Sequence, residues 1–129
     1  MGKREDIVWL TPKEEAFAEF EVRNRTLIVH LKDDLDHHNA IWIREQTDKL
    51  LERKNALNII FDFEKVSFMD SSGIGVVMGR YKRVLFIGGK VAVVGVSDSV
   101  NRIFTLSGLY RIMNHYKSVD EALEVIDAR

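Results

Sequence analysis

The sequence predicts a single α/β domain whose mixed β-sheet opens with an antiparallel hairpin and continues with βαβ units, with about four helices in all. The chain has 129 residues, enough for one hydrophobic core but not for two. From residue 26 onward, strand-like apolar runs alternate with helical periodicities, which favours parallel strands joined by helices. Two earlier strand-like runs meet at a turn at Asn24, which favours a hairpin.

The hairpin and the first long helix are predicted from their periodicities. In the first strand Ala18, Phe20 and Val22 alternate with glutamates, as in a half-exposed strand. Residues 26–31 are expected to form the second strand. A helix is expected over residues 39–54, because its apolar residues fall on one face. That face carries Ala40, Ile43, Thr47, Leu50 and Leu51.

Two further strands are predicted, one before and one after the second helix in the sequence. Residues 57–63 form one strand and residues 90–95 the other, which is nearly all apolar, as strands covered on both faces tend to be. Between them a helix begins near Ser71, because apolar residues recur there at helical spacing. These apolar residues are Ile74, Val77, Met78, Tyr81 and Leu85.

A third helix, a short strand and a fourth helix complete the predicted domain. The pair Ser97-Asp98 is expected to cap the third helix, which ends near Gly108. Residues 112–116 are expected to form a short final strand. Ser118 and Glu121 have the spacing of a capping box and predict the start of the last helix.

An N-terminal extension, residues 1–16, precedes the predicted domain of residues 17–129. The stretch Thr11-Pro12-Lys13-Glu14 has the spacing of a capping box with proline at the first helical position. We therefore expect one helical turn there at most, and a strand-like or packed segment over residues 7–10.

The composition excludes several classes of site and partner. The net charge is −1 and no apolar run approaches the length of a membrane span, so we expect no binding of nucleic acid and no membrane association. The chain has no cysteine, which excludes disulfides and thiolate metal sites. The first six residues lack the apolar region of a secretory signal. We expect a cytoplasmic protein that is a monomer or a weak dimer.

The stretch Asp70-Ser71-Ser72-Gly73-Ile74-Gly75 is the most informative part of the chain for function. It follows a buried-looking strand and opens a helix, so two small hydroxyl residues lie where a helix begins. A serine there can cap free backbone N–H groups, and the helix dipole would stabilise a phosphate on Ser71 or Ser72. On the residues alone, a plain helix cap and a phosphorylation site both remain open.

In their order along the chain, these residues resemble a known family. Residues 69–75, continued by Gly79-Arg80-Tyr81-Lys82, are similar to the anti-sigma-factor antagonists of the STAS fold, most of all to the sporulation stage II AA type. Three further stretches fit the family, namely Leu35-Asp36-His37-His38, Ile87-Gly88-Gly89 and Leu106-Ser107-Gly108-Leu109. The resemblance extends from about Val22 to about Ile126, and the extension before Phe17 is the main departure from it.

The resemblance implies that Ser71 is phosphorylated and that the chain has no catalytic residue and no cofactor of its own. The partner would be an anti-sigma factor with serine kinase activity, which uses ATP, and a metal-dependent protein serine phosphatase would remove the phosphate. The unphosphorylated form would bind the anti-sigma factor and release the sigma factor. The alternatives are a STAS module of a general-stress or other partner-switching complex and, more remotely, a small enzyme with Ser71 as nucleophile.

The same resemblance places the partner-binding surface at the Ser71 helix start and at the loop that contains Asp36. The expected contact residues are Asp36, His37, His38, Asn39, Trp42, Asp70, Ser71, Ser72, Gly73, Gly75 and Val76. Trp42 and Val76 are included because each projects away from the apolar stripe of its own helix, and tryptophan is a typical interface anchor. For Trp42, an intramolecular contact with Trp9 and Leu10 of the extension is the alternative.

The glycines of the motif also approach a dinucleotide-binding fingerprint, but without its full pattern. Gly73, Gly75 and Gly79 have roughly the right spacing, yet the acidic residue expected about 20 positions further on is missing. We expect Gly75 and Gly79 instead to let the helix approach its neighbours closely.

Two other chemistries fit the residues poorly. A serine hydrolase elbow has glycine two positions before the nucleophile, where this chain has Met69. The histidines His37 and His38, together with Asp34 and Asp36, are expected to form a polar loop that ends in a helix cap rather than a metal site.

Overall fold

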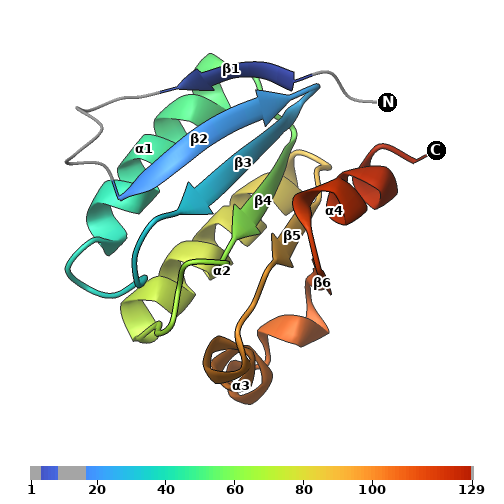
Figure 1. The fold of residues 1–129 in the computed structure, drawn as a ribbon. Coiled ribbons are helices and arrows are strands. Elements are labelled where there is room, and N and C mark those ends of the chain that lie inside the picture. The colour runs from blue at the N-terminus through green and yellow to red at the C-terminus, as the bar shows by residue number, and fades with distance from the viewer. Residues whose placement is uncertain (1–3, 9–16, 129) are drawn as a thin grey trace.

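A computed structural model describes residues 4–8 and 17–128 of the chain and contains a six-stranded β-sheet with helices on both faces (Figure 1). The strands are β1 (Arg4–Val8), β2 (Ala18–Arg23), β3 (Thr26–Leu31), β4 (Asn58–Asp62), β5 (Val91–Val94) and β6 (Asn114–Tyr116). The helices are α1 (Ala40–Arg53), α2 (Ser71–Phe86), α3 (Asp98–Ser107) and α4 (Val119–Ile126), with a 3-10 turn at Leu109–Arg111.

The strands lie side by side in the order in which they occur in the chain. β2 pairs antiparallel with β3, and β3 to β6 are parallel to one another. This confirms the predicted sheet, in which an antiparallel hairpin is followed by βαβ units. The extension contributes a strand as well, because β1 pairs antiparallel with β2 and places Val8 opposite Phe20. The helical turn expected at Thr11 lies outside the described residues.

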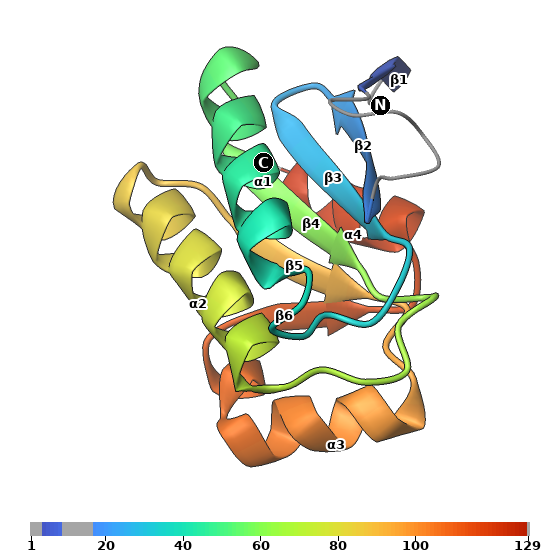
Figure 2. The same ribbon diagram turned by 90° about the vertical axis from the view of Figure 1, so that its left-hand side faces the viewer.

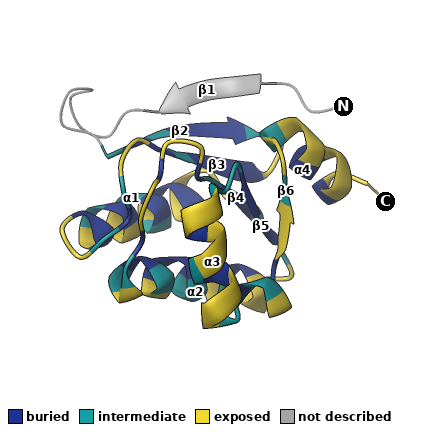
Figure 3. Cartoon of the chain, turned by 60° about the horizontal axis from the view of Figure 1, so that its bottom comes forward, coloured by how far each residue is buried: buried dark blue, intermediate teal, exposed yellow. Residues whose placement is uncertain are grey.

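The hydrophobic core lies on both sides of the sheet. The larger part is enclosed by the sheet and α1, α2 and α3, and Phe61, Phe63 and Phe104 are fully buried there. The smaller part lies under α4, which covers Ile28 and Ile60. Figure 2 shows α1 and α2 on one face of the sheet and α4 on the other, and Figure 3 shows that buried residues line the sheet and the inner sides of the helices.

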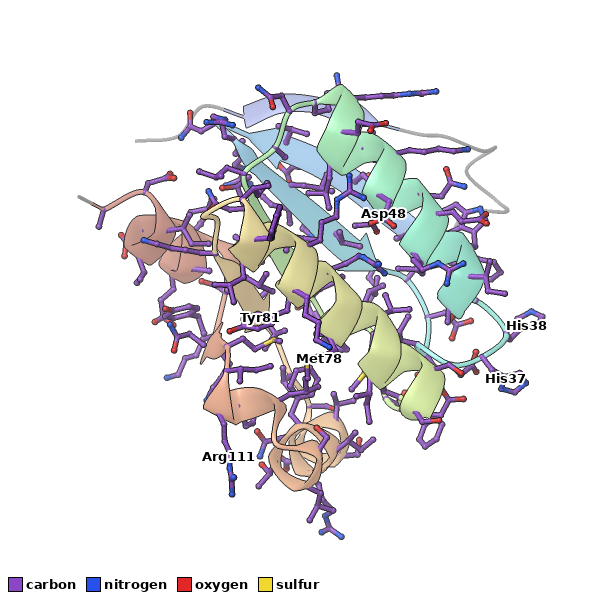
Figure 4. All side chains as sticks on the ribbon, turned by 180° about the vertical axis from the view of Figure 1, so that it is seen from behind. His37, His38, Asp48, Met78, Tyr81 and Arg111 are labelled. Carbon is purple, nitrogen blue, oxygen red and sulfur yellow. The ribbon has the colours of Figure 1, made fainter. Side chains whose placement is uncertain are left out.

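The helices α1 and α2 lie side by side and begin at the same end of the molecule (Figures 2 and 4). They follow the parallel strands β3 and β4, whose carboxyl ends meet at one edge of the sheet. A β-bridge joins Leu35, before α1, to Met69, before α2. The loop that precedes α1 therefore lies next to the first turn of α2.

The predicted apolar face is correct for α1 and partly wrong for α2. All five predicted residues of α1 are buried. On α2, Val77 is buried, but Leu85 is 56% exposed, while Val76 and Arg80 are buried instead. The reason is that α2 packs against α1 as well as against the sheet, which buries the side of α2 that faces α1. The periodicity of one helix does not indicate where a neighbouring helix lies.

A partly buried charged cluster lies on the face of the sheet that carries α4. Glu21, which the alternation placed on an exposed face, is only 3% exposed. Its carboxylate lies 2.8 Å from His30 Nε2 and accepts a hydrogen bond from Arg23 Nε at 3.0 Å, and His30 Nδ1 lies 2.7 Å from Asp62 Oδ2. The hydrogen bond with Asp62 raises the pKa of His30, with a further contribution from Glu21. Burial alone would raise the pKa of Glu21 and Asp62, but the hydrogen bonds with His30 hold both pKa values below their ordinary range.

The predicted caps of the last two helices are confirmed. The hydroxyl of Ser97 caps α3, and Gly108 ends that helix in the left-handed conformation with φ +81°. The hydroxyl of Ser118 accepts a hydrogen bond from the Glu121 N–H at 3.1 Å. The Glu121 carboxylate accepts its return hydrogen bond from the Lys117 N–H at 3.0 Å, one residue earlier than in a regular capping box. Among the described residues, none of the helices combines the length and apolar character needed to cross a membrane.

Candidate functional site

Ser71 is the first residue of α2, and the residue before it caps the helix. Asp70 Oδ1 accepts hydrogen bonds from the backbone N–H groups of Ser72 at 2.8 Å and of Gly73 at 3.2 Å. Of the two alternatives left open for the serines, the plain helix cap is therefore not the one that the structure contains. A carboxylate of the preceding residue reaches the same N–H groups, and the exposed Ser71 hydroxyl makes no hydrogen bond within the described part of the chain. The hydroxyl is thus available for modification at the positive end of α2.

The other oxygen of Asp70 connects α2 to the loop that precedes α1. Asp70 Oδ2 accepts a hydrogen bond from the His37 backbone N–H at 3.1 Å and lies 3.4 Å from His37 Nδ1. Desolvation would raise the pKa of Asp70, but hydrogen bonds from the backbone N–H groups of His37, Gly73 and Ser72 and from the His37 ring lower it. A fixed negative charge therefore lies beside Ser71.

The loop before α1 is shaped by its own polar side chains. Asp34 Oδ1 accepts hydrogen bonds from the backbone N–H groups of Ser67 at 2.8 Å and of Phe68 at 3.0 Å. Asp36 Oδ1 accepts one from the His38 N–H at 2.9 Å. Asp36 thus forms an Asx turn, whereas Asp34 ties this loop to the segment before α2. No group of metal-ligating side chains forms among the described residues.

The buried side chain of Asn39 holds this loop together through hydrogen bonds. It occupies the cap position of α1, but its side chain does not cap the helix. The Asn39 side-chain oxygen accepts a hydrogen bond from the Asp36 N–H at 3.1 Å, and its amide donates to the Asp34 carbonyl. Asn39 is only 4% exposed. Its role in the described structure is therefore to fix the loop, which leaves Asp36, His37 and His38 nearer the surface. Figure 4 shows His37 and His38 beside the first turn of α2.

The glycines of the motif differ sharply in their surroundings. Gly73 is buried, and a Cβ atom there would collide with the carbonyl oxygen of Leu35 and lie 2.6 Å from Met69 Cγ. A Cβ at Gly75 or Gly79 would meet no atom within 4 Å. The expectation that Gly75 and Gly79 allow a close approach is wrong, because the chain that approaches α2 most closely is the loop at Leu35, which reaches only its first turn.

The two apolar residues expected on the surface are covered by neighbouring elements. Val76 is 5% exposed, because it faces α1. Trp42 is half-buried, with its ring centroid 5.5 Å from that of Phe17 and 6.0 Å from that of Phe20. The start of β2 thus covers Trp42, which the helical periodicity of α1 alone could not indicate. The alternative contact with Trp9 and Leu10 lies outside the described residues.

A groove that sequence reasoning missed runs between the first turns of α1 and α2. Its volume is about 530 Å³, and it opens beside the motif. It is lined by His37, Ala40, Ile41, Arg44, Ser72, Gly75, Val76 and Arg80. Ile41 is 60% exposed although it is apolar. Ile41 and Arg44 are three residues apart and hence on one side of α1, but only the position of α2 makes that side a groove.

The floor of this groove contains a buried cation. Arg80 Nε lies 3.0 Å from Asp48 Oδ1, which also lies 3.2 Å from an Arg83 nitrogen. Burial lowers the pKa of Arg80, and the positive charges of Arg44 and Arg83 oppose the attraction of Asp48. Asp48 thus joins α1 to α2 through its ion pairs with Arg80 and Arg83.

Comparison with known proteins shows which family and which relatives the chain is similar to. Residues 17–122 match the STAS domain family. An anti-sigma F factor antagonist of Paenibacillus polymyxa is 38% identical over 109 residues, which cover 84% of this chain and 93% of that protein. An anti-sigma-B factor antagonist of Bacillus subtilis is 33% identical over 86 residues, or 67% of this chain and 77% of that protein.

Solved structures agree with the fold. The Bacillus cell fate determinant SpoIIAA in its phosphorylated form has a TM-score of 0.68 and 31% identity, over 84% of this chain and 98% of that one. Its unphosphorylated form has a TM-score of 0.70 and 26% identity, over 87% and 99%. The protein TM1081 of Thermotoga maritima has a TM-score of 0.80 over 84% and 93%, and at 24% identity this likeness concerns the fold alone.

Proposed function

This chain belongs to the STAS domain family, among its anti-sigma factor antagonists, and we propose that phosphorylation of Ser71 switches its binding to an anti-sigma factor. The unphosphorylated form binds an anti-sigma factor that is also a serine kinase, and the sigma factor is released. The kinase then uses ATP to phosphorylate Ser71, which ends binding, and a metal-dependent protein serine phosphatase restores the first form. The role is regulatory, in the cytoplasm, and needs no cofactor of the chain's own.

The observation that carries this proposal is the exposed Ser71 hydroxyl at the start of α2. Because Asp70 already caps the helix, the Ser71 side chain is not needed for that purpose. Its position is accessible to a kinase, and the helix dipole stabilises a phosphate there. The similarity to SpoIIAA, which has been solved in a phosphorylated and an unphosphorylated form, supports the same assignment.

We propose that the contact surface consists of the loop before α1, the first turn of α2 and the groove between them. Its exposed members are His37, His38, Ile41, Arg44, Ser71 and Gly75, and Asp36 is half-buried beside them. Asn39, Gly73 and Val76, which we first expected to bind the partner, lie beneath this surface and hold it in place.

Phosphorylation acts here by adding charge at an interface built around a neutral hydroxyl. The phosphate carries about −1.5 to −2 charges at pH 7 and stands next to the Asp70 carboxylate. Repulsion and the cost of desolvating an unmatched dianion oppose binding. A penalty of about 3–4 kcal/mol lowers the affinity several-hundred-fold.

A second candidate circuit is favoured by one observation. The similarity to an anti-sigma-B factor antagonist, at 33% identity, supports a general-stress switch as the alternative to a sporulation switch. Both circuits use the same surface and differ in the sigma factor that is released.

The test is phosphorylation by the anti-sigma factor of the same organism. The purified chain is incubated with that protein and magnesium ATP, and the product is mapped by peptide mass spectrometry. We expect one phosphate on Ser71, none in Ser71→Ala and an unchanged phosphate in the matched control Ser72→Ala. Calorimetry should show that Ser71→Ala binds the anti-sigma factor and that the phosphorylated wild type binds several-hundred-fold more weakly. Phosphate on another residue of Ser71→Ala, at wild-type stoichiometry, refutes the assignment.

A further inference from the structure

The far end of α2 carries an exposed apolar tip. Leu85 is 56% exposed, Phe86 90% and Ile87 52%. We call these three consecutive residues the apolar tip. The chain behind the tip is held in place, because the Gly89 N–H donates to the Val84 carbonyl at 2.9 Å and Gly89 is packed against the Leu57 carbonyl. The exposure of the apolar tip is therefore a fixed property of the end of α2.

Three turns at this end of the molecule, one of which carries the apolar tip, are rich in basic residues. Residues 24–25, 52–55 and 82–90 contain six basic residues and one acidic residue. The basic residues are Arg25, Arg53, Lys54, Lys82, Arg83 and Lys90. The turns meet at one edge of the sheet, since the Leu57 N–H donates to the Arg25 carbonyl at 2.7 Å and the Lys90 N–H donates to Asn58 Oδ1 at 2.9 Å.

Two carboxylates offset part of this charge. Asp48 pairs with Arg83 at 3.2 Å, and Asp127 of the last turn lies 3.3 Å from the Asn24 side chain. The remaining cations are exposed and lie on separate turns. This end of the molecule is therefore basic, although the chain as a whole carries a net charge of −1.

The charge at the Ser71 end has the opposite sign. Residues 32–38 and 64–70, which flank Ser71, contain five acidic and two basic residues. Figure 4 shows that α1 and α2 both end on the side of the molecule away from His37 and His38. The small net charge of the chain thus hides a basic end and two acidic loops beside Ser71. The expectation of no membrane association was based on the net charge and did not consider where the charges lie.

We propose that the basic end is a docking surface for a membrane that contains anionic lipids. Phe86 and its neighbours enter the interfacial region, while the surrounding lysines and arginines lie against the lipid phosphates. An exposed apolar tip with exposed cations on the neighbouring turns matches a flat and diffuse layer of anions. This orientation points Ser71 away from the bilayer, so that the anti-sigma factor and the membrane are bound at the same time.

The test uses the full chain and vesicles of two compositions. Sedimentation with vesicles of phosphatidylcholine alone is compared with vesicles that also contain phosphatidylglycerol. We expect binding to the anionic vesicles only, and its loss at high salt, because exposed charges are screened. The double variant Lys82→Gln and Lys90→Gln should bind about 25-fold more weakly, at about fivefold for each cation. Phe86→Ser should also weaken binding.

Variants at other exposed positions test whether vesicle binding depends on the basic end. Leu106→Ser removes an apolar residue that is 80% exposed on α3, and the double variant Arg102→Gln and Arg111→Gln removes two exposed cations away from the basic end. Both should bind anionic vesicles like the wild type, as should Ser71→Ala, which separates this proposal from the phosphorylation switch. Absence of binding at low salt, or equal weakening by the controls, overturns the proposal. If Phe86→Ser instead weakens only the affinity for the anti-sigma factor, the apolar tip is a protein interface and not a membrane one.

Discussion

Asp70 and His37, 33 positions apart in the chain, are joined by a hydrogen bond from the His37 backbone N–H to Asp70 Oδ2 at 3.1 Å. The same carboxylate caps α2 through its other oxygen. One side chain therefore sets both the direction of the Ser71 helix and the position of the Asp36 loop beside it. The two segments expected to meet the anti-sigma factor are thus one surface.

Asp70→Ala should lower both stability and partner affinity. The variant loses the cap of α2 and the link to His37, which should decrease the free energy of unfolding. Urea denaturation measures the stability and calorimetry measures the affinity. As a control, Asp98→Ala removes an exposed carboxylate from the first turn of α3 that does not cap it, and it should cost only a few tenths of a kcal/mol. Equal losses in both variants would contradict the role assigned to Asp70.

The two glycines of the motif should respond in opposite ways to alanine. Gly73→Ala places a methyl group against the Leu35 carbonyl oxygen and should lower the free energy of unfolding by about 2–3 kcal/mol. Gly75→Ala adds a methyl group in open space within a helix and should be neutral or stabilising by up to about 1 kcal/mol. The comparison needs only thermal or urea unfolding of the two variants. A Gly73→Ala protein as stable as the wild type would show that the loop at Leu35 can move to accommodate the methyl group.

Asp34 and Asp36, two residues apart, should separate structure from binding. Asp34 accepts hydrogen bonds from two backbone N–H groups of the loop before α2, so Asp34→Ala should cost about 1–3 kcal/mol of stability. Asp36 accepts one such bond from His38 near the surface, so Asp36→Ala should cost less stability but weaken binding to the anti-sigma factor. If Asp36→Ala loses several degrees in Tm at unchanged affinity, Asp36 serves only to shape the loop.

The Glu21–His30–Asp62 cluster should make stability depend on pH in a defined window. The raised pKa of His30 means that its contribution is complete below the ordinary value of 6.5 and is lost as the pH rises through the folded-state pKa. The lowered pKa values of Glu21 and Asp62 mean that their contribution is present above their ordinary values of 4.5 and 3.8 and is lost as the pH falls through the folded-state values. Stability from this cluster should therefore be greatest between about pH 5 and 6.5.

Urea denaturation across pH 3 to 9 measures this effect as the difference between the wild type and His30→Gln. The difference should shrink as the pH rises above 6.5, because glutamine does not titrate. His115→Gln, which changes an exposed histidine on β6 away from the cluster, is the control for the loss of a histidine. A constant difference between wild type and His30→Gln over pH 6 to 9 would show that folding does not raise the pKa of His30.

Phosphorylation of Ser71 should act locally. The donors at the start of α2 already point outward, and the close-packed residues beneath them, such as Val77, have no cause to move. Amide chemical shifts of the two forms should differ over residues 70–76 and in the Asp36 loop, and hardly at all in α4. Changes throughout the sheet would indicate a switch between two folded states instead.

The sequence predicted best those features that depend on one segment at a time. The buried face of α1 and the caps at Ser97 and Ser118 follow from local spacing, and all agree with the structure. The order of strands and helices likewise led to the correct sheet. Features that depend on a neighbouring element were missed: Val76 is covered by α1, and Trp42 by Phe17 and Phe20.

The same distinction between local features and features that depend on a neighbouring element applies to the candidate site. The position of Ser71 at a helix start could be predicted, because strand, loop and helix follow one another in the chain. The residue that caps this helix could not be predicted, since serine and aspartate can both satisfy the same N–H groups. The groove with Arg44 and Arg80 requires two helices to be placed side by side, and periodicity within either helix carries no such information.

The pairing of β1 with β2 has a consequence for how the protein behaves at high concentration. An unpaired outer strand is a template for strands of other molecules and hence for aggregation. On one side, the sheet ends in β6, whose three residues offer little to pair with. On the other side, removal of residues 1–8 would expose the six residues of β2 along their full length. The extension that departs most from the family therefore shields the longer margin of the sheet, and a truncated chain is the form most prone to fibrous assembly.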